Sequence, residues 1–180
     1  MLMLSIRQIK PEEVDELHEL LRKCGEDMRD RFGLSHWVPP YPLDQMREST
    51  VNQRVYAVEG ETGLVATFTL DTQAPPYYRP DIWEEPNAQA IYLHRLAVLP
   101  ALQGQGIGSW CLKSIETHAL TENYDAIRLD AFAPHRTLLK FYRKANYHWR
   151  ATLTIQIPRR GSNDIACFEK TRRDFAGPRS

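Results

Sequence analysis

The chain has 180 residues, of which 42% are hydrophobic, so it is long enough for one domain with a sizeable core. Its 23 basic and 23 acidic residues cancel, and this balance argues against nucleic acid or an anionic membrane as the main partner. Three cysteines without a CxxC pair argue against a disulfide framework and a structural zinc site. No apolar run approaches the roughly 18 residues of a membrane span. We therefore expect a single cytoplasmic domain over residues 1–180 with no metal site.

The first part of the sequence predicts a strand, two helices and a β-hairpin. Apolar residues at helical spacing predict a first helix that begins near Pro11 and ends at Gly25, a residue suited to a C-terminal cap. Residues 26–41 begin with a high density of charge and end in a stiff aromatic segment with little regular structure, Trp37–Tyr41, that either walls a pocket or seals the edge of the core. The other predicted elements are a strand at Leu4–Ile9, a helix at Leu43–Val51 and hairpin strands at Arg54–Glu59 and Leu64–Asp71.

A long loop, Thr72–Gln89, leads into the central stretch of the chain. Loops of this length inside compact domains are usually functional or disordered. The strand Ala90–Leu99 that follows changes the parity of its apolar residues: Ile91 and Leu93 share one face, and Leu96 and Val98 share the other. Either the strand is buried on both faces, or a β-bulge lies near His94–Leu96.

The C-terminal part of the sequence predicts a βαβ unit and two further strands. After the glycine-rich turn, an apolar stripe at four-residue steps predicts a helix from Ile107 to Ala119, and the strand Asp125–Phe132 should pair in parallel with the first. Further elements are expected at His135–Ala145 (helix, ended by Asn146), Tyr147–Ile157 (strand), Pro158–Asp164 (turn) and Ile165–Lys170 (strand), with 171–180 a frayed tail.

The glycine-rich turn, Gln103-Gly104-Gln105-Gly106-Ile107-Gly108, lies where a strand meets a helix. Unpaired backbone N–H groups and the helix dipole favour an anion at such a place, most often a phosphate. The spacing fits neither the P-loop nor the dinucleotide fingerprint, so both of these nucleotide motifs are disfavoured.

Two motifs together resemble the GNAT superfamily of acyl-CoA-dependent N-acyltransferases. The family's Q/R-x-x-G-x-G/A turn, which follows a bulged central strand, is matched by Gln103, Gly106 and Gly108. A downstream family pattern, N-x-x-A-x-x-x-Y-x-x-x-G-F, is similar to HRTLLKFYRKANY and aligns Tyr142 with the family's Tyr. His135 stands for the usual Asn, Leu138 for Ala and Asn146 for Gly.

The resemblance implies an α/β fold with a mixed, mostly antiparallel sheet, splayed at a bulged central strand and flanked by helices. It implies transfer of an acetyl group from acetyl-CoA to a primary amine of a small molecule or peptide, by direct attack in a ternary complex. The implied coenzyme-binding residues are Leu96, Ala97, Val98, Gln103, Gly104, Gln105, Gly106, Ile107, Gly108, His135 and Tyr142. Trp37–Tyr41 and Thr72–Gln89 are expected to shape the acceptor site.

The implied catalytic residues are Tyr142, which would protonate the departing thiolate, and a general base. Tyr92 aligns with a position that holds a catalytic Glu in some relatives, and a tyrosine is a poor base near neutral pH. His94 shares the strand parity of Tyr92, and histidine as a residue type has a near-neutral reference pKa, so His94 is the best single-residue candidate, with a structural histidine as the alternative.

Other polar residues are expected to have structural or supporting roles. Asp81, Glu84 and Glu85 either act through water or are solvated loop carboxylates, and Asp130 is expected to pair with Arg128. Cys111 falls on a buried helix stripe, which disfavours a nucleophilic role. Alternatives to the enzyme are a non-catalytic acyl-CoA sensor and a nucleotide-binding domain. No nucleic-acid or membrane partner is expected, and a homodimer is left open.

Overall fold

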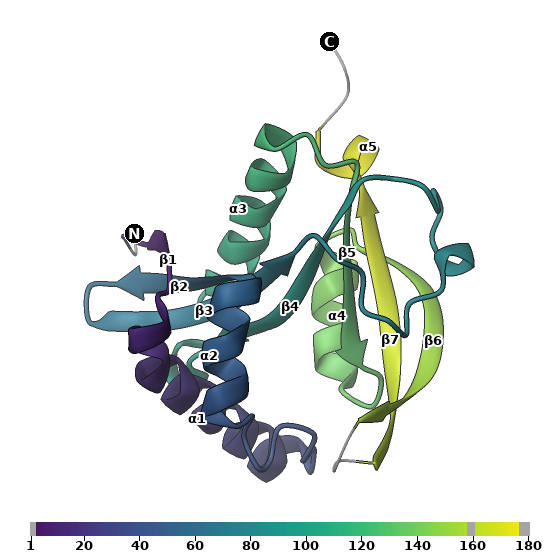
Figure 1. Ribbon diagram of the computed structural model, residues 1–180. Coiled ribbons are helices and arrows are strands. Elements are labelled where there is room, and N and C mark those ends of the chain that lie inside the picture. Colours follow the sequence, from purple (N-terminus) through teal and green to yellow (C-terminus); the bar gives the residue numbers. More distant parts are fainter. Residues whose placement is uncertain (1–2, 158–160, 177–180) are drawn as a thin grey trace. The chain divides into compact units, whose positions relative to one another are not determined.

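The computed structural model describes residues 3–157 and 161–176 (Figure 1). It divides into two compact units, which we describe separately: residues 1–71 with 94–111, and residues 72–93 with 112–180. The chain passes from one unit to the other within strand β4 (Ala90–Val98) and within helix α3 (Ile107–Thr121). The seven strands follow the order β1-β2-β3-β4-β5-β7-β6, with one parallel pair, so the expected α/β class with a mixed, mostly antiparallel sheet and flanking helices is confirmed.

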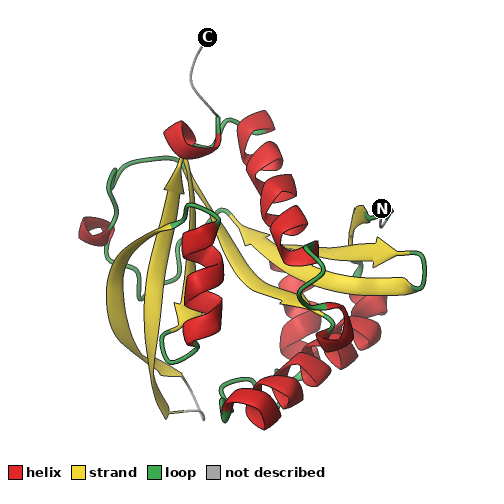
Figure 2. Ribbon diagram, turned by 180° about the vertical axis from the view of Figure 1, so that it is seen from behind, coloured by secondary structure: helices red, strands yellow, loops and turns green. Residues whose placement is uncertain are grey.

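The first unit is an antiparallel ribbon of three strands packed against two helices. The apolar side chains of α1 form one stripe and meet residues of α2 and β2 in a continuous buried core. Helix α2 lies in front of these strands in Figure 1 and behind them in Figure 2, so the helices cover one face. The elements are β1 (Ser5–Gln8), the 3-10 turn η1 (Pro11–Glu13), α1 (Val14–Phe32), α2 (Leu43–Asn52), β2 (Arg54–Gly60), β3 (Gly63–Asp71) and the 3-10 turn η3 (Pro100–Leu102).

Helix α1 does not end at Gly25, so the expected stop is wrong. The helix continues to Phe32, and Gly33 caps it in the left-handed region with φ of 68°. A Cβ on Gly25 would lie 2.8 Å from the carbonyl oxygen of Trp37. Gly25 is therefore required by a close approach of the Trp37 backbone and not by a turn.

Strand β4 combines both features that its sequence allowed. Ile91, Tyr92 and Leu93 are all buried, so the first part of the strand is covered on both faces. Its parallel pairing joins Ala90–Leu93 to Ala126–Leu129 of β5. Arg95 then has a φ of 51°, which interrupts the extended backbone inside His94–Leu96, where an irregularity was predicted.

The second unit packs a helix and a loop on opposite faces of its strands. Helix α4 lies behind β5 and β7 in Figure 1 and in front of them in Figure 2, whereas the Thr72–Gln89 loop crosses the other face. Under the loop, Tyr78 and Trp83 pack with Tyr92, Ile165 and Cys167 in one buried cluster. The elements are the 3-10 turn η2 (Pro80–Ile82), β5 (Ala126–Phe132), α4 (Arg136–Lys144), β6 (His148–Ile157), β7 (Gly161–Thr171) and α5 (Arg172–Phe175).

Two expectations about the C-terminal part need correction. Strand β7 begins at Gly161, so Gly161–Asp164 belong to a hairpin with β6 and not to a turn, while Pro158–Arg160 lie outside the described residues. The start of the expected frayed tail is a short helix, α5, in which the Asp174 carboxylate accepts hydrogen bonds from the Thr171 N–H and hydroxyl, both at 2.9 Å. Residues 177–180 of that tail also lie outside the described part.

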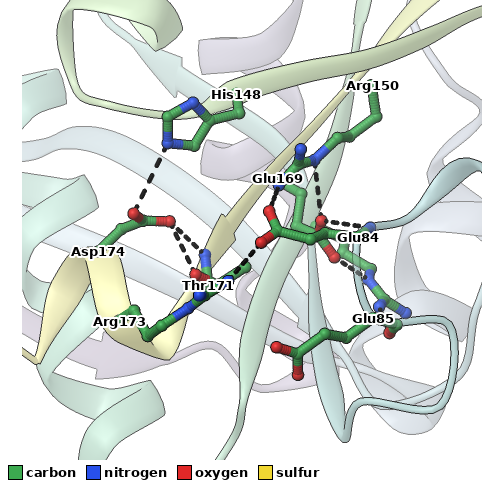
Figure 3. Close-up of polar contacts among 9 residues, drawn as sticks. Glu84, Glu85, His148, Arg150, Glu169, Thr171, Arg173 and Asp174 are labelled. Atoms are coloured by element: carbon green, nitrogen blue, oxygen red, sulfur yellow. Dashed lines mark hydrogen bonds and ion pairs between the residues drawn. The ribbon is translucent and has the colours of Figure 1, made fainter.

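Buried and partly buried ion pairs fasten the Thr72–Gln89 loop to the second unit (Figure 3). The fully buried Glu169 accepts hydrogen bonds from Nε of Arg128 at 3.0 Å, Nε of Arg150 at 2.9 Å and the backbone N–H of Glu84 at 3.0 Å. The Glu84 carboxylate binds Arg150 and Arg173. Glu84 therefore anchors the loop through its backbone N–H and its ion pairs, while its side chain stays exposed to solvent.

No helix within the described residues has the length and apolar character that crossing a membrane requires.

Replacing Gly25 with alanine should destabilise the protein, although the same change in a helix normally stabilises it by about 1 kcal/mol. The new methyl group would collide with the Trp37 backbone, and we expect the free energy of unfolding to fall by about 1–3 kcal/mol. Urea denaturation measures this change. Glu16→Ala, at an exposed position of the same helix, is the control and should stay within about 0.5 kcal/mol of the parent. A more stable Gly25→Ala protein would contradict the steric explanation.

Replacing Glu169 with alanine should destabilise the protein by about 3–5 kcal/mol, because Arg128 would remain buried without its carboxylate. The loop should also become a preferred site of limited proteolysis, since its Glu84 N–H loses an acceptor. Urea denaturation and a timed protease digest measure the two effects. Glu122→Ala, which removes an exposed carboxylate, should change neither. Unchanged loop cleavage in Glu169→Ala would show that the loop is held by other contacts.

Candidate active site

The glycine-rich turn presents an open row of backbone donors at the start of α3. Gly104 and Gly106 have φ of 79° and 86°, a region that side-chain-bearing residues rarely adopt. In the described part of the chain, the N–H groups of Gly104, Gln105 and Gly106, which precede α3, donate no hydrogen bond to a protein acceptor. A Cβ on Gly104 or Gly106 would meet no atom within 4 Å, so the space above the turn is open. The turn can therefore receive an anion on several N–H groups at once.

Gln103 holds the turn against the end of β4. Its Nε2 donates to the carbonyl oxygen of Val98 at 3.1 Å, and its Oε1 accepts from Nη1 of Arg31 on α1 at 3.3 Å. The Val98 carbonyl also accepts a hydrogen bond from the Cys24 thiol at 3.3 Å. The side chain of Gln103 thus positions the turn, and its backbone N–H donates to the Pro100 carbonyl at 3.2 Å.

The remaining first-unit candidates lie along the second part of β4. Ala97 is buried, whereas His94, Leu96 and Val98 are half-buried. The N–H of Leu99 donates to the Val65 carbonyl of β3 at 2.9 Å. The candidate residues of the strand and those of the glycine-rich turn therefore follow one another in a single segment of the first unit.

Tyr142 occupies a buried position on α4 in the second unit. Its ring packs against Tyr147 and Phe168, with ring centres 6.0 Å and 5.8 Å away. Only 4% of the residue is exposed, and its hydroxyl makes no hydrogen bond to another described residue. Burial, with a smaller contribution from the Asp130 charge, raises the pKa of Tyr142 well above its ordinary value, so the hydroxyl stays protonated. A protonated hydroxyl that donates to no protein group is available as a proton donor.

His135 serves as the N-cap of α4. Its Nδ1 accepts a hydrogen bond from the Leu138 N–H at 3.4 Å, and 9% of the residue is exposed. The capping role gives a reason for the difference from the family pattern: histidine, like the asparagine of that pattern, can accept a hydrogen bond at the start of a helix. A direct contact of His135 with the coenzyme stays a prediction.

Asp130 does not pair with Arg128, and the expected ion pair is wrong. Its Oδ2 accepts hydrogen bonds from the hydroxyls of Tyr78 at 2.7 Å and Tyr77 at 3.2 Å, while Arg128 binds Glu169. Burial raises the pKa of Tyr78, which keeps this phenol a donor. Two adjacent tyrosines in the loop, Tyr77 and Tyr78, were the feature of the sequence that could have indicated a hydrogen bond to a carboxylate, but the sequence does not show which strand they cover.

The cysteines are buried thiols rather than nucleophiles. Burial raises the pKa of Cys111 to about 12, and the pKa values of Cys24 and Cys167 are raised to about 12 in the same way. Thiols of this kind remain protonated near neutral pH, so a ping-pong mechanism through Cys111 is disfavoured. Across residues 3–157 and 161–176, no cluster of three His, Cys, Asp or Glu residues could hold a metal ion.

Arg95 is the polar residue of β4 that the sequence reasoning missed. Its side chain reaches α2, where Nη2 donates to Oγ of Ser49 at 3.1 Å and to Oε1 of Gln53 at 3.0 Å. A cation inside an otherwise apolar strand was the available signal.

Comparison with known proteins agrees with these features. The sequence matches the model of the Acetyltransferase (GNAT) family over residues 14–147. It is 30% identical over 142 residues to the uncharacterized N-acetyltransferase YesJ of Bacillus subtilis (strain 168), covering 77% of this chain and 78% of that protein.

Solved structures show the same fold at low sequence identity. A GNAT-family acetyltransferase from Streptococcus agalactiae 2603 superposes with a TM-score of 0.76 at 16% identity, covering 93% of this chain and 95% of that one. A second, from Listeria monocytogenes 4b F2365, has a TM-score of 0.74 at 16% identity, covering 93% and 94%. Because the family match extends over more than half of the sequence, the chain belongs to the GNAT acetyltransferase family, and its general activity is that of an acyltransferase.

Proposed function

We propose that this protein transfers an acetyl group from acetyl-CoA to a primary amine of a small molecule or peptide, by direct attack in a ternary complex. The observation that carries the proposal is the open turn before α3, whose N–H groups from Gly104 to Gly106 donate to no other described residue. Family membership supports acyl transfer; the donor and the acceptor are our inference.

The turn fits the pyrophosphate of coenzyme A. Positive φ values at Gly104 and Gly106 direct successive N–H groups to one side, and the absence of Cβ atoms lets phosphate oxygens come close. The positive end of the α3 dipole adds to the attraction, so no lysine is needed.

The second part of β4 is proposed to hold the acyl arm. N–H groups along a strand point alternately to its two edges. Since the Leu99 N–H is directed to Val65 of β3, Val98 and Leu96 are expected to direct theirs to the opposite edge. There, Val98 would bind the pantetheine amide, and the Leu96 N–H would donate to the thioester oxygen as negative charge develops on it, an interaction worth about 3 kcal/mol in comparable sites.

Proton transfers are assigned to Tyr142 and His94. The amine must lose a proton to attack, and His94 is the proposed acceptor because imidazole titrates near neutral pH. The thiolate that leaves must gain a proton, and the protonated Tyr142 hydroxyl is the proposed donor. Its raised pKa means that it stays protonated at pH values above the ordinary tyrosine pKa of about 10.

Binding of the coenzyme should depend on the glycine turn. Gly106→Ala should raise the dissociation constant of coenzyme A about 10-fold, or about 1.4 kcal/mol, because the methyl group enters the phosphate space and strains the backbone. Isothermal titration measures this. Gly63→Ala is the matched control: it has φ of 105° and open space in a hairpin turn, so it bears similar backbone strain without touching the turn. Wild-type protein that fails to bind coenzyme A would overturn the proposal.

Removing the Tyr142 hydroxyl should slow acetyl transfer while leaving coenzyme binding intact. Tyr142→Phe should lower kcat about 100-fold or more, since the thiolate loses its proton donor, with little change in KM for acetyl-CoA. Thiol release with a panel of primary amines measures the rate. Tyr147→Phe is the control, because its buried hydroxyl also lacks a hydrogen-bond partner among the described residues. Equal kcat values in Tyr142→Phe and the parent would exclude this role, and coenzyme binding without turnover of any amine would favour a non-catalytic acyl-CoA sensor.

A further inference from the structure

Strand β6 forms one edge of the sheet and has a free side along its length. In the strand order it comes last, next to β7 alone. Figures 1 and 2 both show it as the outermost strand of the second unit. Among the described residues, none of its backbone groups bonds the backbone of a loop or a helix. Because an antiparallel strand directs only alternate residues to its neighbour, the other N–H and C=O groups of β6 point to the free side.

The stretch Ala151–Ile157 of this edge lacks the features that usually protect an exposed strand. Its sequence, ATLTIQI, contains no charged residue, no proline and no glycine. The stretch follows the irregularity of the ladder at Arg150 and then pairs with β7 residue by residue. Uncharged windows that are rich in β-branched and apolar residues pair readily with other strands. The free side of Ala151–Ile157 is therefore well suited to receive a further strand.

The opposite edge of the sheet, β1, is protected. It has only 4 residues, Ser5–Gln8. Arg7 at its centre forms ion pairs with Glu13 at 2.8 Å and Glu59 at 2.9 Å, and Pro11 follows shortly after the strand. Short length, charge and a nearby proline all discourage pairing with another chain. The chain thus protects one edge of its sheet and leaves the other open.

The open stretch is complementary to a second copy of itself. Its side chains alternate between half-buried apolar residues (Ala151, Leu153, Ile155 and Ile157) and exposed polar residues (Thr152, Thr154 and Gln156). This alternation is symmetric about Thr154. An antiparallel copy related by a two-fold axis at Thr154 would therefore place apolar residues opposite apolar ones on one face and polar residues opposite polar ones on the other. No like charges would meet, because the stretch carries none.

We propose that a second copy of this chain pairs with Ala151–Ile157, antiparallel and across a two-fold axis at Thr154, so that the protein forms a homodimer with a continuous sheet. A contact of this kind is isologous, and it closes at two chains because each copy uses its one open stretch. Pairing of two short stretches makes a small interface, so the dimer should dissociate on dilution. The inference concerns the second unit alone and does not depend on acetyl transfer.

Charges placed on the exposed face test the pairing and its register. In the proposed dimer, Thr152 of one chain lies opposite Gln156 of the other. Thr152→Lys combined with Gln156→Lys therefore sets like charges opposite each other twice and should raise the dimer dissociation constant at least 10-fold. Thr152→Lys combined with Gln156→Glu is the matched control: opposite charges then face each other, and the dimer should persist. Both positions are exposed, so both variants should melt at the parent's temperature in dilute solution.

Sedimentation equilibrium between about 10 μM and about 1 mM measures the association. The wild-type mass should rise with concentration from the 20.9 kDa of one chain towards twice that value. The mass of the Lys/Lys variant should stay near that of one chain over most of this range, whereas the Lys/Glu variant should follow the wild type.

A cysteine at the two-fold axis tests the register directly. Opposed side chains of paired strands have Cβ atoms about 4.5–5.5 Å apart, close to the separation in a disulfide. Thr154→Cys should therefore form a disulfide-linked dimer under mild oxidation. Cys24, Cys111 and Cys167 are buried, so they contribute little background. Gln8→Cys, at an exposed position of β1, is the control and should remain largely unlinked.

Each contrary result overturns the proposal. A wild-type protein that stays monomeric at about 1 mM would show that no second copy binds this edge. Equal association of the Lys/Lys and Lys/Glu variants would place the contact on another surface. Assemblies larger than two chains would contradict the closed two-fold pair, and equal linking of Thr154→Cys and Gln8→Cys would mean that the cysteines meet only by random collision.

Discussion

A single left-handed residue, Arg95, divides β4 into two parts with different uses. Before it, Ala90–Leu93 are buried and form the parallel ladder with β5. After it, the strand leads to the glycine-rich turn, and the side chain of Gln103 in that turn donates a hydrogen bond to the Val98 carbonyl at the end of the strand. A regular strand would alternate its side chains without interruption; here the backbone departs from that geometry at Arg95, whose guanidinium binds Ser49 and Gln53 of α2. The interruption therefore links the strand, the turn and the polar cluster of the first unit.

Local patterns predicted most of the fold because helices and hairpins depend on neighbouring residues. Helix α2, the β2–β3 hairpin and β5 begin and end within about two residues of their expected bounds. Gly25 was misread because the reason for a glycine there is the Trp37 backbone, which no local pattern reveals. The choice of Glu169 over Asp130 as the partner of Arg128 likewise depends on strand register between distant parts of the chain.

The candidate site was predictable to the extent that its residues are consecutive. The turn from Gln103 to Gly108 forms a motif, and its geometry follows from the glycines. Arg95 could not be assigned because its environment is made by Ser49 and Gln53 of a separate helix. The general base is in the same situation: its identity depends on the acceptor's position, which neither the pattern of β4 nor the half-buried state of His94 defines.

The Thr72–Gln89 loop is held at two points along its length, so only a short part of it lies between fixed residues. Tyr78 is fixed through Asp130, and Glu84 is fixed through Glu169. Between these anchors, Arg79, Pro80 and Asp81 are exposed. The entropy cost of closing a loop depends on the number of residues between its fixed points. For this loop, the relevant number is the few residues between Tyr78 and Glu84. Substitutions at Arg79, Pro80 and Asp81 can change the surface chemistry of the loop while both fixed points stay in place. These positions can therefore differ among related proteins at little cost in stability.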